Sequence, residues 1–232
     1  MISFTEGQKQ VDVFPAAGPD RPVLYLHTFG QEGREVWNQL KASGCPDFTL
    51  AAVSGLDWNH DMVPWDAPAL SDTDAPFTGG ADAWLRLLTD RILPQAEAAV
   101  PGTPAWRGIA GYSLAGLFAL YAAWNTDAFS RAASISGSLW FPGFREYLLS
   151  RPPAPALSCL FLSLGDRECR TRNPYLKHVQ QNTEDIAAFC RQQGIDTVFR
   201  LNPGGHFKNS TARTAAGIRY LLEPSPAADA YP

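Results

Sequence analysis

Short apolar runs alternate with helix-like segments along nearly the whole chain, and this alternation constrains the fold most strongly. Six runs bounded by Gly, Pro or Asp, several of them rich in β-branched or aromatic residues, are typical of buried strands: Val23–Leu26, Phe48–Val53, Trp106–Ala110, Ala132–Ile135, Cys159–Leu164 and Thr197–Leu201. Helical patterns lie between these runs. Alternation of this kind predicts an α/β fold with a mostly parallel central sheet and helices on both faces.

The helical segments are identified by apolar residues that recur at near-helical spacing. They cover Asp82–Val100, Leu114–Trp124, Thr183–Gln193 and a last segment around Ile218–Leu222. Within them, Pro94 predicts a kink, because proline cannot donate the usual backbone hydrogen bond. Asn182 has the features of an N-cap, and Gly194 is expected to end the same helix.

Length and charge set limits on the classes of protein to consider. The 232 residues fit one domain, since a single core can grow to roughly 250 residues, and we expect residues 223–232 to form a loose tail. The net charge of −4 gives no electrostatic reason to expect nucleic acid or an anionic membrane as partner. The sequence does not indicate an oligomeric state.

The N-terminus and the cysteines bear on the compartment. MISFTEGQKQVDVF lacks a basic stretch followed by a long apolar run, and no segment has about 18 consecutive apolar residues, so we expect a cytoplasmic protein. The four cysteines are scattered and include no C-x-x-C pair, which favours reduced thiols. Cys159 and Cys190 have apolar neighbours and are expected in the core.

The segment Gly111–Gly116 reads GYSLAG and lies between a predicted strand and a predicted helix. It is similar to the nucleophile elbow G-x-S-x-G, with Ala115 in place of the second glycine. Small residues suit this turn because bulk two places from the serine would clash across it. The pattern predicts Ser113 as a nucleophile; a glycine-rich turn with an idle serine is the alternative.

Two histidines follow Ser113 and could act as its base. His178 lies in the polar stretch NPYLKHVQQN and is predicted to be a surface residue. His206 lies in NPGGHF, a loop between the last strand and the last helix, where glycines let the backbone turn toward the serine. We therefore predict His206 as the general base.

A serine nucleophile and its histidine base commonly work with a third residue, a carboxylate that orients the histidine, and the three form a catalytic triad. We expect this acid after the strand Cys159–Leu164, in the segment GDREC. Asp166 is nearer to the strand end, while Glu168 stands three places after the glycine, a spacing that is common in such enzymes. We favour Glu168, with Asp166 as the alternative. Its task would be to orient the imidazole and stabilise its charged form. Cys169 would then border the site.

The strand Val23–Leu26 ends in HTFG, which has the place and form of a loop that supplies an oxyanion-binding amide. We expect one donor from Phe29 and the second from Leu114, the residue after the nucleophile. Thr28 stands where glycine is usual, and His27 is expected to brace the loop.

The segment DWNHDMVPW follows a predicted strand and is expected to form part of a substrate pocket. Trp58 and Trp65 would be its apolar walls, and Trp140 would either line the same cleft or belong to the core. Asp57, His60 and Asp61 allow a metal-site interpretation. We do not favour it, because no further histidine or cysteine set completes the coordination.

Taken together, HTFG, DWNHDMVPW, GYSLAGL, SLGDRE and PGGHF resemble small esterases of the α/β-hydrolase fold. This group includes esterase D, feruloyl esterases and siderophore (enterochelin-type) esterases. The resemblance implies a serine esterase with no cofactor and a small-molecule ester as its substrate. Because a hydrolase-fold core would use nearly all of the chain, we expect no large lid domain and a fairly open cleft.

Two other classes of function are compatible with these motifs. One is a hydrolase-fold protein that has lost catalysis and binds a ligand or partner. The other is a thioesterase or peptidase of the same fold. The order Ser113, Glu168, His206 speaks against the first.

Overall fold

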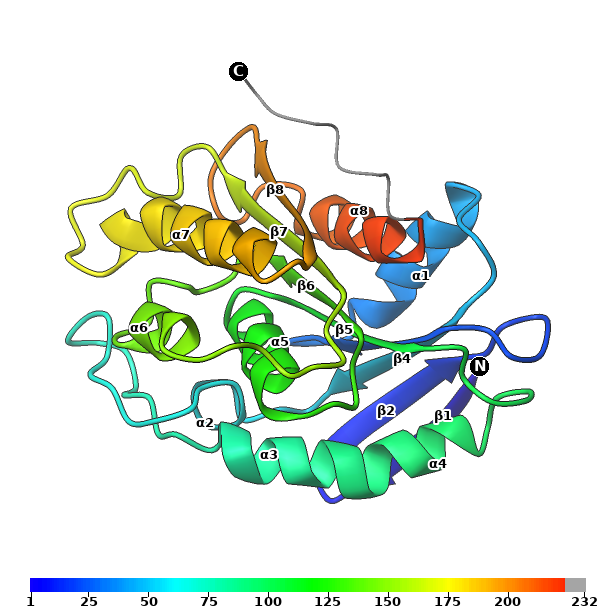
Figure 1. The fold of residues 1–232 in the computed structure, drawn as a ribbon. Coiled ribbons are helices and arrows are strands. Elements are labelled where there is room, and N and C mark those ends of the chain that lie inside the picture. The colour runs from blue at the N-terminus through cyan, green and yellow to red at the C-terminus, as the bar shows by residue number, and fades with distance from the viewer. Residues whose placement is uncertain (224–232) are drawn as a thin grey trace.

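Within residues 1–223, which this computed structural model describes, eight strands form one sheet in the order β1-β2-β4-β3-β5-β6-β7-β8 (Figure 1). Strands β3 to β8 are parallel, and β1 and β2 form an antiparallel edge. The strand bounds are Ile2–Glu6 (β1), Lys9–Phe14 (β2), Val23–His27 (β3), Thr49–Ser54 (β4), Arg107–Tyr112 (β5), Arg131–Ile135 (β6), Cys159–Gly165 (β7) and Asp196–Asn202 (β8). The predicted, mostly parallel sheet is confirmed.

The hairpin β1–β2 is absent from the predicted elements. Its register pairs Ile2 with Val13 and Glu6 with Lys9, and Gly7 in the turn has φ +60°. Both strands alternate polar and apolar residues, and the buried Val11 and Val13 extend the core over β2.

Helices cover both faces of the sheet (Figure 1). On one face, α1 and α8 pack against each other and bury Val36, Leu40, Ile218 and Leu221. The other face is covered by α5, α7 and the α3–η1–α4 segment. The helix bounds are Gly33–Ala42 (α1), Trp58–Asp61 (α2), Ala81–Leu87 (α3), Leu88–Ile92 (η1), Leu93–Glu97 (α4), Leu114–Asn125 (α5), Phe144–Leu149 (α6), Leu176–His178 (η2), Val179–Gln192 (α7) and Ser210–Leu222 (α8).

Two expected helix details differ from the structure. Helix α7 begins at Val179, whose buried side chain anchors its first turn, so Asn182 is not a cap. The Asn182 amide instead donates to the Leu139 carbonyl (2.8 Å). At Pro94 the helix continues through a wider π-helical turn, η1, which accommodates the proline's missing N–H without a sharp break.

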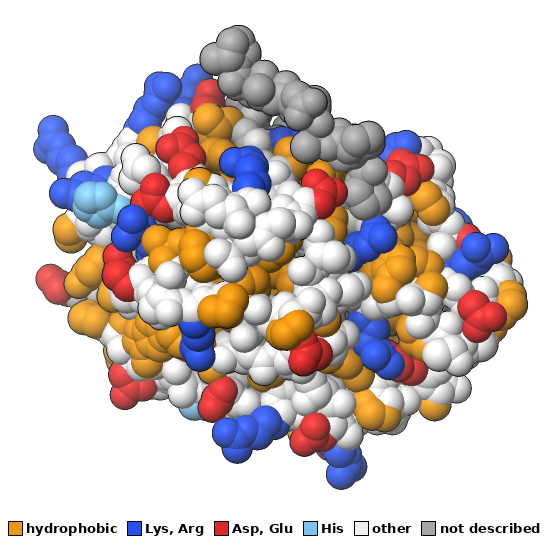
Figure 2. Space-filling view, in the orientation of Figure 1, with side chains coloured by type: hydrophobic (Ala, Val, Ile, Leu, Met, Phe, Trp, Pro, Cys, Tyr) orange, Lys and Arg blue, Asp and Glu red, His pale blue; other side chains and the backbone are white. Residues whose placement is uncertain are grey.

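The carboxyl ends of the parallel strands meet at one edge of the sheet, and the loops that follow β3, β5, β6, β7 and β8 gather there (Figure 1). This edge is where ligands bind in open α/β sheets. On the face seen in Figure 2, acidic and basic side chains are interspersed. No helix within residues 1–223 is long and apolar enough to cross a membrane. The expected tail, apart from Glu223, lies outside the described residues.

Candidate active site

Ser113 lies in the turn between β5 and α5 with φ 60° and ψ −124°. Non-glycine residues rarely adopt a positive φ, and such strain is typical of functional turns. The turn is fixed because the Ser113 amide donates to the Ile135 carbonyl (3.1 Å). A Cβ at Gly111 would lie 2.3 Å from the backbone of Ala115, so only glycine fits there and the Ala115 methyl is tolerated. The local geometry is that of a nucleophile elbow.

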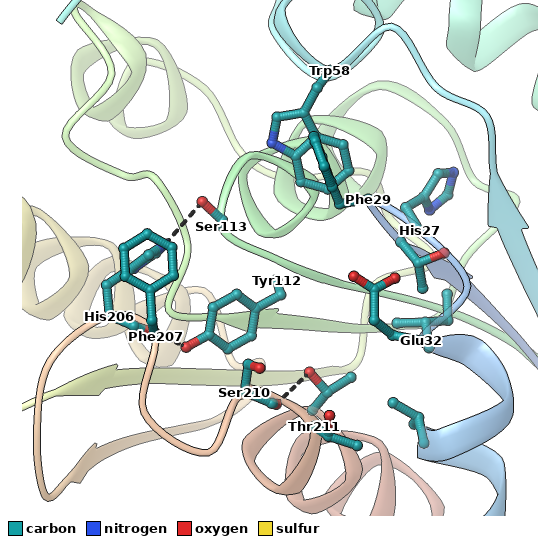
Figure 3. Close-up of a pocket in the computed structure, with 14 residues that line it drawn as sticks. His27, Phe29, Glu32, Trp58, Tyr112, Ser113, His206, Phe207, Ser210 and Thr211 are labelled. Atoms are coloured by element: carbon teal, nitrogen blue, oxygen red, sulfur yellow. Dashed lines mark hydrogen bonds between the residues drawn. The ribbon is translucent and has the colours of Figure 1, made fainter.

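The imidazole of His206 lies between Ser113 and Glu168. Its hydrogen bond with Ser113 is the dashed line that leads from the serine hydroxyl in Figure 3. Its Nε2 is 3.0 Å from Ser113 Oγ, and its Nδ1 is 2.8 Å from Glu168 Oε2. The Tyr112 hydroxyl donates to the His206 carbonyl and fixes the loop. A histidine with these two contacts can accept a proton from the serine hydroxyl.

Glu168 is buried, with 6% of its side chain exposed. Its Oε1 accepts hydrogen bonds from the Gly165 amide (2.5 Å) and the Ser136 hydroxyl (2.8 Å). Burial alone would raise the pKa of Glu168, but the hydrogen bonds it accepts, first that from His206, outweigh burial and lower the pKa. The carboxylate is therefore held in its charged form beside the imidazole.

Arg213 of α8 lies beneath this pair, almost wholly buried. Its guanidinium donates to Glu168 Oε1 (3.3 Å), to Ser136 Oγ (3.2 Å) and to the Pro203 carbonyl (3.2 Å). It thus ties the carboxylate to the loop that carries His206. The two loops approach so closely that a Cβ at Gly165 would lie 2.2 Å from the Gly204 carbonyl oxygen.

The alternative acid, Asp166, has a different set of contacts. Its Oδ1 accepts from the Gly204 amide (2.7 Å), and its own amide donates to the Asn202 carbonyl (2.8 Å). It therefore shapes the start of the loop that carries His206. The structure brings Glu168, rather than Asp166, against the imidazole.

The loop after β3 carries the expected oxyanion donor. The Thr28 hydroxyl shares its proton between the carbonyls of Gly30 (2.8 Å) and Val53 (3.1 Å), so the buried threonine side chain has its polar partners within the protein. Among the described residues, no acceptor pairs with the amide of Phe29 or with that of Leu114. Both amides are therefore free to bind a developing oxyanion.

The other histidines lie outside this chain of hydrogen bonds. His27 is buried edge-on against Trp84 and Phe118, and burial lowers its pKa to about 3, so it is neutral. His178 is exposed at the end of η2, as expected for a surface residue.

Two cavities meet at Ser113. The first, of about 430 Å³, is called the His206 cavity because His206 lines it, together with Phe29, Glu32, Tyr112 and Phe207 (Figure 3). The second, of about 280 Å³, is called the Trp140 cavity and is also lined by Leu70, Phe77, Leu114 and Ser138. Trp58 and Ser113 line both. An ester held at Ser113 would have room for a group on either side.

Residues 30–188 match the family described as "Putative esterase". The chain belongs to this esterase family. It is 27% identical to the uncharacterized protein YbbA of Bacillus subtilis (strain 168) over 153 residues, which are 65% of this chain and 61% of YbbA. The aligned part is thus less than two thirds of that relative.

Solved structures of esterase-like proteins share the fold of this family member. An IroE-like serine hydrolase from Shewanella oneidensis superposes with a TM-score of 0.73 at 18% identity, over 92% of this chain and 75% of its own. The siderophore hydrolase EstA from Aspergillus nidulans superposes with a TM-score of 0.69 at 18% identity, and the match covers 94% of this chain and 90% of EstA. These likenesses confirm the predicted α/β-hydrolase fold, and the described residues contain no large lid.

Of the three tryptophans predicted to line the substrate pocket of this esterase-family chain, two line a cavity at Ser113 and one does not. Trp58 lines both cavities, and Trp140 lines the one named after it. Trp65 lines neither: it packs against Phe141, Phe144 and Tyr147, and its indole N–H donates to the Pro142 carbonyl (2.9 Å). Its expected role as a pocket wall is wrong, because its loop turns inward onto α6.

The segment considered for a metal is held by protein contacts. Asp61 pairs with Lys9 and accepts from the Asp57 amide (2.7 Å), while His60 Nδ1 lies 3.1 Å from the Thr78 hydroxyl. Within residues 1–223 no three His, Cys, Asp or Glu side chains gather as a metal site would require.

Of the cysteines, Cys159 and Cys190 are buried as expected, and burial raises the pKa of each to about 12. Cys169 lines neither cavity at Ser113, and its thiol donates to Gln180 Oε1 (3.3 Å). It therefore faces α7 and does not border the site as expected.

Four further residues lie at the site and were not predicted from the sequence: Ser136, Arg213, Glu32 and Phe207. Ser136 follows Ile135, which pairs with Tyr112 across β5 and β6, so strand adjacency alone could have placed it beside Ser113. Arg213 stands at helical spacing from the buried Gly217 and Leu221, and a cation on a buried face requires a partner. Glu32 and Phe207 carry no comparable signal, since both lie in loops.

Proposed function

We propose that this chain hydrolyses carboxylic esters through an acyl-enzyme on Ser113, with His206 as general base. The observation that carries the proposal is the continuous chain of hydrogen bonds from Glu168 through His206 to Ser113. Ser113, at the end of this chain, lines two cavities that could hold an ester. Membership of the esterase family supports the same class of reaction. No cofactor takes part in the proposed reaction.

Acylation begins when Ser113 Oγ attacks the ester carbonyl carbon and its proton passes to His206 Nε2. The carbonyl oxygen becomes an oxyanion, which the amides of Phe29 and Leu114 bind. Each such donor typically stabilises the transition state by about 3–4 kcal/mol. Glu168 stabilises the imidazolium and stays ionised throughout, in keeping with its lowered pKa.

The tetrahedral intermediate collapses when its bond to the alcohol oxygen breaks, and His206 gives its proton to the leaving alcohol. Water then enters the site, His206 takes one of its protons, and the resulting hydroxide attacks the acyl carbon. The second tetrahedral intermediate then collapses: the bond from the acyl carbon to Ser113 Oγ breaks, His206 returns its proton to Oγ, and the acid leaves. The same steps would serve a thioester or a peptide, so a thioesterase or peptidase is the alternative within catalysis.

The open cleft bears on the size of the substrate. Large parts of Phe29 and Phe207 are exposed at its rim, and no large lid covers it among the described residues. These features favour small or partly exposed esters over a deeply enclosed lipid. Because the structurally similar EstA is a siderophore hydrolase, siderophore lactones belong in any panel of test substrates.

The test is hydrolysis of matched p-nitrophenyl esters from acetate to octanoate, an aryl ester, a siderophore lactone, a thioester and a peptide. Wild type should hydrolyse short esters fastest, and Ser113→Ala should reduce kcat by at least about 10³-fold. Ser158→Ala, an exposed serine, is the matched control and should keep full activity. Absence of ester turnover by folded wild type would favour the binding-protein alternative.

A further inference from the structure

Among the described residues, the two cavities at Ser113 contain no cationic side chain of their own. Their lining residues include neither lysine nor arginine, but each cavity has one carboxylate, Glu32 in the His206 cavity and Asp74 in the Trp140 cavity. The nearby buried cation, Arg213, directs its guanidinium toward Glu168, Ser136 and Pro203. The electrostatic character of the cleft therefore comes from acidic and aromatic groups.

The position of His206 tells which half of an ester each cavity would take. This step rests on the proposed function, in which His206 gives its proton to the leaving alcohol. His206 lines only the His206 cavity, so the alcohol half lies there. The acyl half is then directed to the Trp140 cavity, which Leu114 lines.

Aromatic rings dominate the wall of the His206 cavity. Phe29 and Trp58 meet edge to face (centroids 5.3 Å apart), and Tyr112 and Phe207 flank His206 (Figure 3). Phe29 is 72% exposed and Phe207 is 90% exposed. Large apolar side chains gathered on an exposed surface mark a place where a ligand buries them. The rings suit a flat or apolar alcohol group.

Glu32 is the formal charge in this cavity. Its Oε2 accepts a hydrogen bond from the Gly30 amide (2.8 Å), which directs the carboxylate beside the oxyanion loop. No lysine, arginine or histidine within residues 1–223 forms an ion pair with it. Arg34 on the adjoining helix instead contacts Met1 and the ring of Phe14. The N-terminus of α8, with Ser210 and Thr211, offers only a partial positive charge across the cavity.

We propose that this enzyme acts on esters of uncharged, largely apolar alcohols or phenols, and that Glu32 discriminates against anionic alcohol groups. An anionic group in the His206 cavity would meet a carboxylate of the same sign, and no lysine or arginine lines the cavity to compensate it. Specificity often depends on such a repulsive element as much as on attraction. Polyanionic catecholate esters would therefore be poor substrates.

The test compares two acetate esters that differ in one charge, methyl 3-acetoxybenzoate and 3-acetoxybenzoate. Wild type should prefer the neutral ester by about tenfold in kcat/KM at low salt, as expected for like charges a few ångströms apart in a partly solvated site. The preference should fall as ionic strength rises. Glu32→Gln keeps the side-chain length and an acceptor for the Gly30 amide, and should reduce the preference to about twofold.

Glu35→Gln is the matched control, because Glu35 is exposed on α1 close to Glu32 but does not line the cavity. It should leave the preference of wild type unchanged. Equal turnover of both esters by wild type, or an unchanged preference in Glu32→Gln, would overturn the proposal while leaving esterase activity intact. If neither ester is hydrolysed, the proposed function itself fails.

Discussion

The two sides of Ser113 are built differently. On the inner side, Glu168, Ser136 and Arg213 are buried, and each has a polar partner within 3.3 Å. On the outer side, Phe29 and Phe207 are mostly exposed, and the amides expected to bind an oxyanion have no partner within the described part of the chain. The side chains of the inner side are held by protein contacts before any ligand binds. The exposed rings and free amides of the outer side gain partners only when a ligand binds.

This difference separates two kinds of effect. A change on the inner side should affect the chemical step or the stability of the fold, because it leaves a buried charge or polar group unpaired. A change on the outer side should affect substrate affinity and choice, because no buried group is left without a partner.

The strongest test of the inner side is Glu168→Gln, with Asp166→Asn as its matched control. Loss of the carboxylate beside His206 Nδ1 should lower kcat by about 10³–10⁴-fold, as found when the acid of a triad is neutralised. Asp166→Asn keeps an oxygen for the Gly204 amide and should cost less than about tenfold. Steady-state kinetics on a short p-nitrophenyl ester measures both. A larger loss in Asp166→Asn would show that the acid is misassigned.

Removal of the buried cation should destabilise the fold. In Arg213→Met the carboxylate of Glu168 keeps its burial but loses its cation, so the free energy of unfolding should fall by about 3–5 kcal/mol. Arg86→Met removes an exposed pair with Asp82 and should cost less than about 1 kcal/mol. Urea unfolding at neutral pH measures both. Equal effects would mean that burial of Arg213 contributes little.

His27, buried at the end of β3, gives the stability of the fold a dependence on pH. Because burial lowers the pKa of His27 to about 3, the unfolded chain, with a pKa of about 6.5, takes up the proton first. Stability conferred by neutral His27 is complete above pH 6.5 and is lost as pH falls toward 3. Relative to His27→Phe, wild type should lose about 2 kcal/mol of unfolding free energy between pH 7 and pH 5.

Urea unfolding at the two pH values measures this difference. The matched control is His178→Phe, since His178 is exposed. Its unfolding free energy should follow that of wild type at both pH values. A difference between wild type and His27→Phe that stays constant from pH 7 to pH 5 would contradict the assignment of a neutral, buried His27.

The smallest effect is expected on the outer side. Phe207→Ala removes a ring that is 90% exposed, so the free energy of unfolding should change by less than about 0.5 kcal/mol. KM for an aryl ester should rise about fivefold through loss of apolar contact, while kcat stays within about twofold. Kinetics and urea unfolding on the same preparation measure both quantities. A loss of kcat on the scale of Glu168→Gln would remove the distinction between the two sides.

The parts of the molecule that could be predicted from sequence are those with a local signal. Buried parallel strands are continuous apolar runs, so all six predicted runs overlap with strands. The elbow needs small residues at fixed places, and His206 stands in a glycine-rich loop. Ser113, His206 and Glu168 could therefore be singled out from the sequence, and the structure brings the three side chains into contact.

The parts that could not be predicted depend on contacts between distant segments. Trp65 packs against residues about 80 positions later in the chain, and nothing near it indicates the direction of its side chain. Arg213 meets Glu168 only because α8 crosses the sheet beneath β7. The strands of the β1–β2 hairpin are short and half polar, and they join the sheet only because β2 pairs with β4.

Covalent labelling tests directly whether Ser113 is an activated nucleophile. Wild type should react with a fluorophosphonate probe to one label per chain, and peptide mapping should find that label on Ser113, because only a serine activated by an adjacent base attacks the phosphorus at a useful rate. Ser113→Ala should take up no label, and Ser158→Ala should label as wild type does. Folded wild type that stays unlabelled, or Ser113→Ala that labels normally, would show that Ser113 is not the nucleophile.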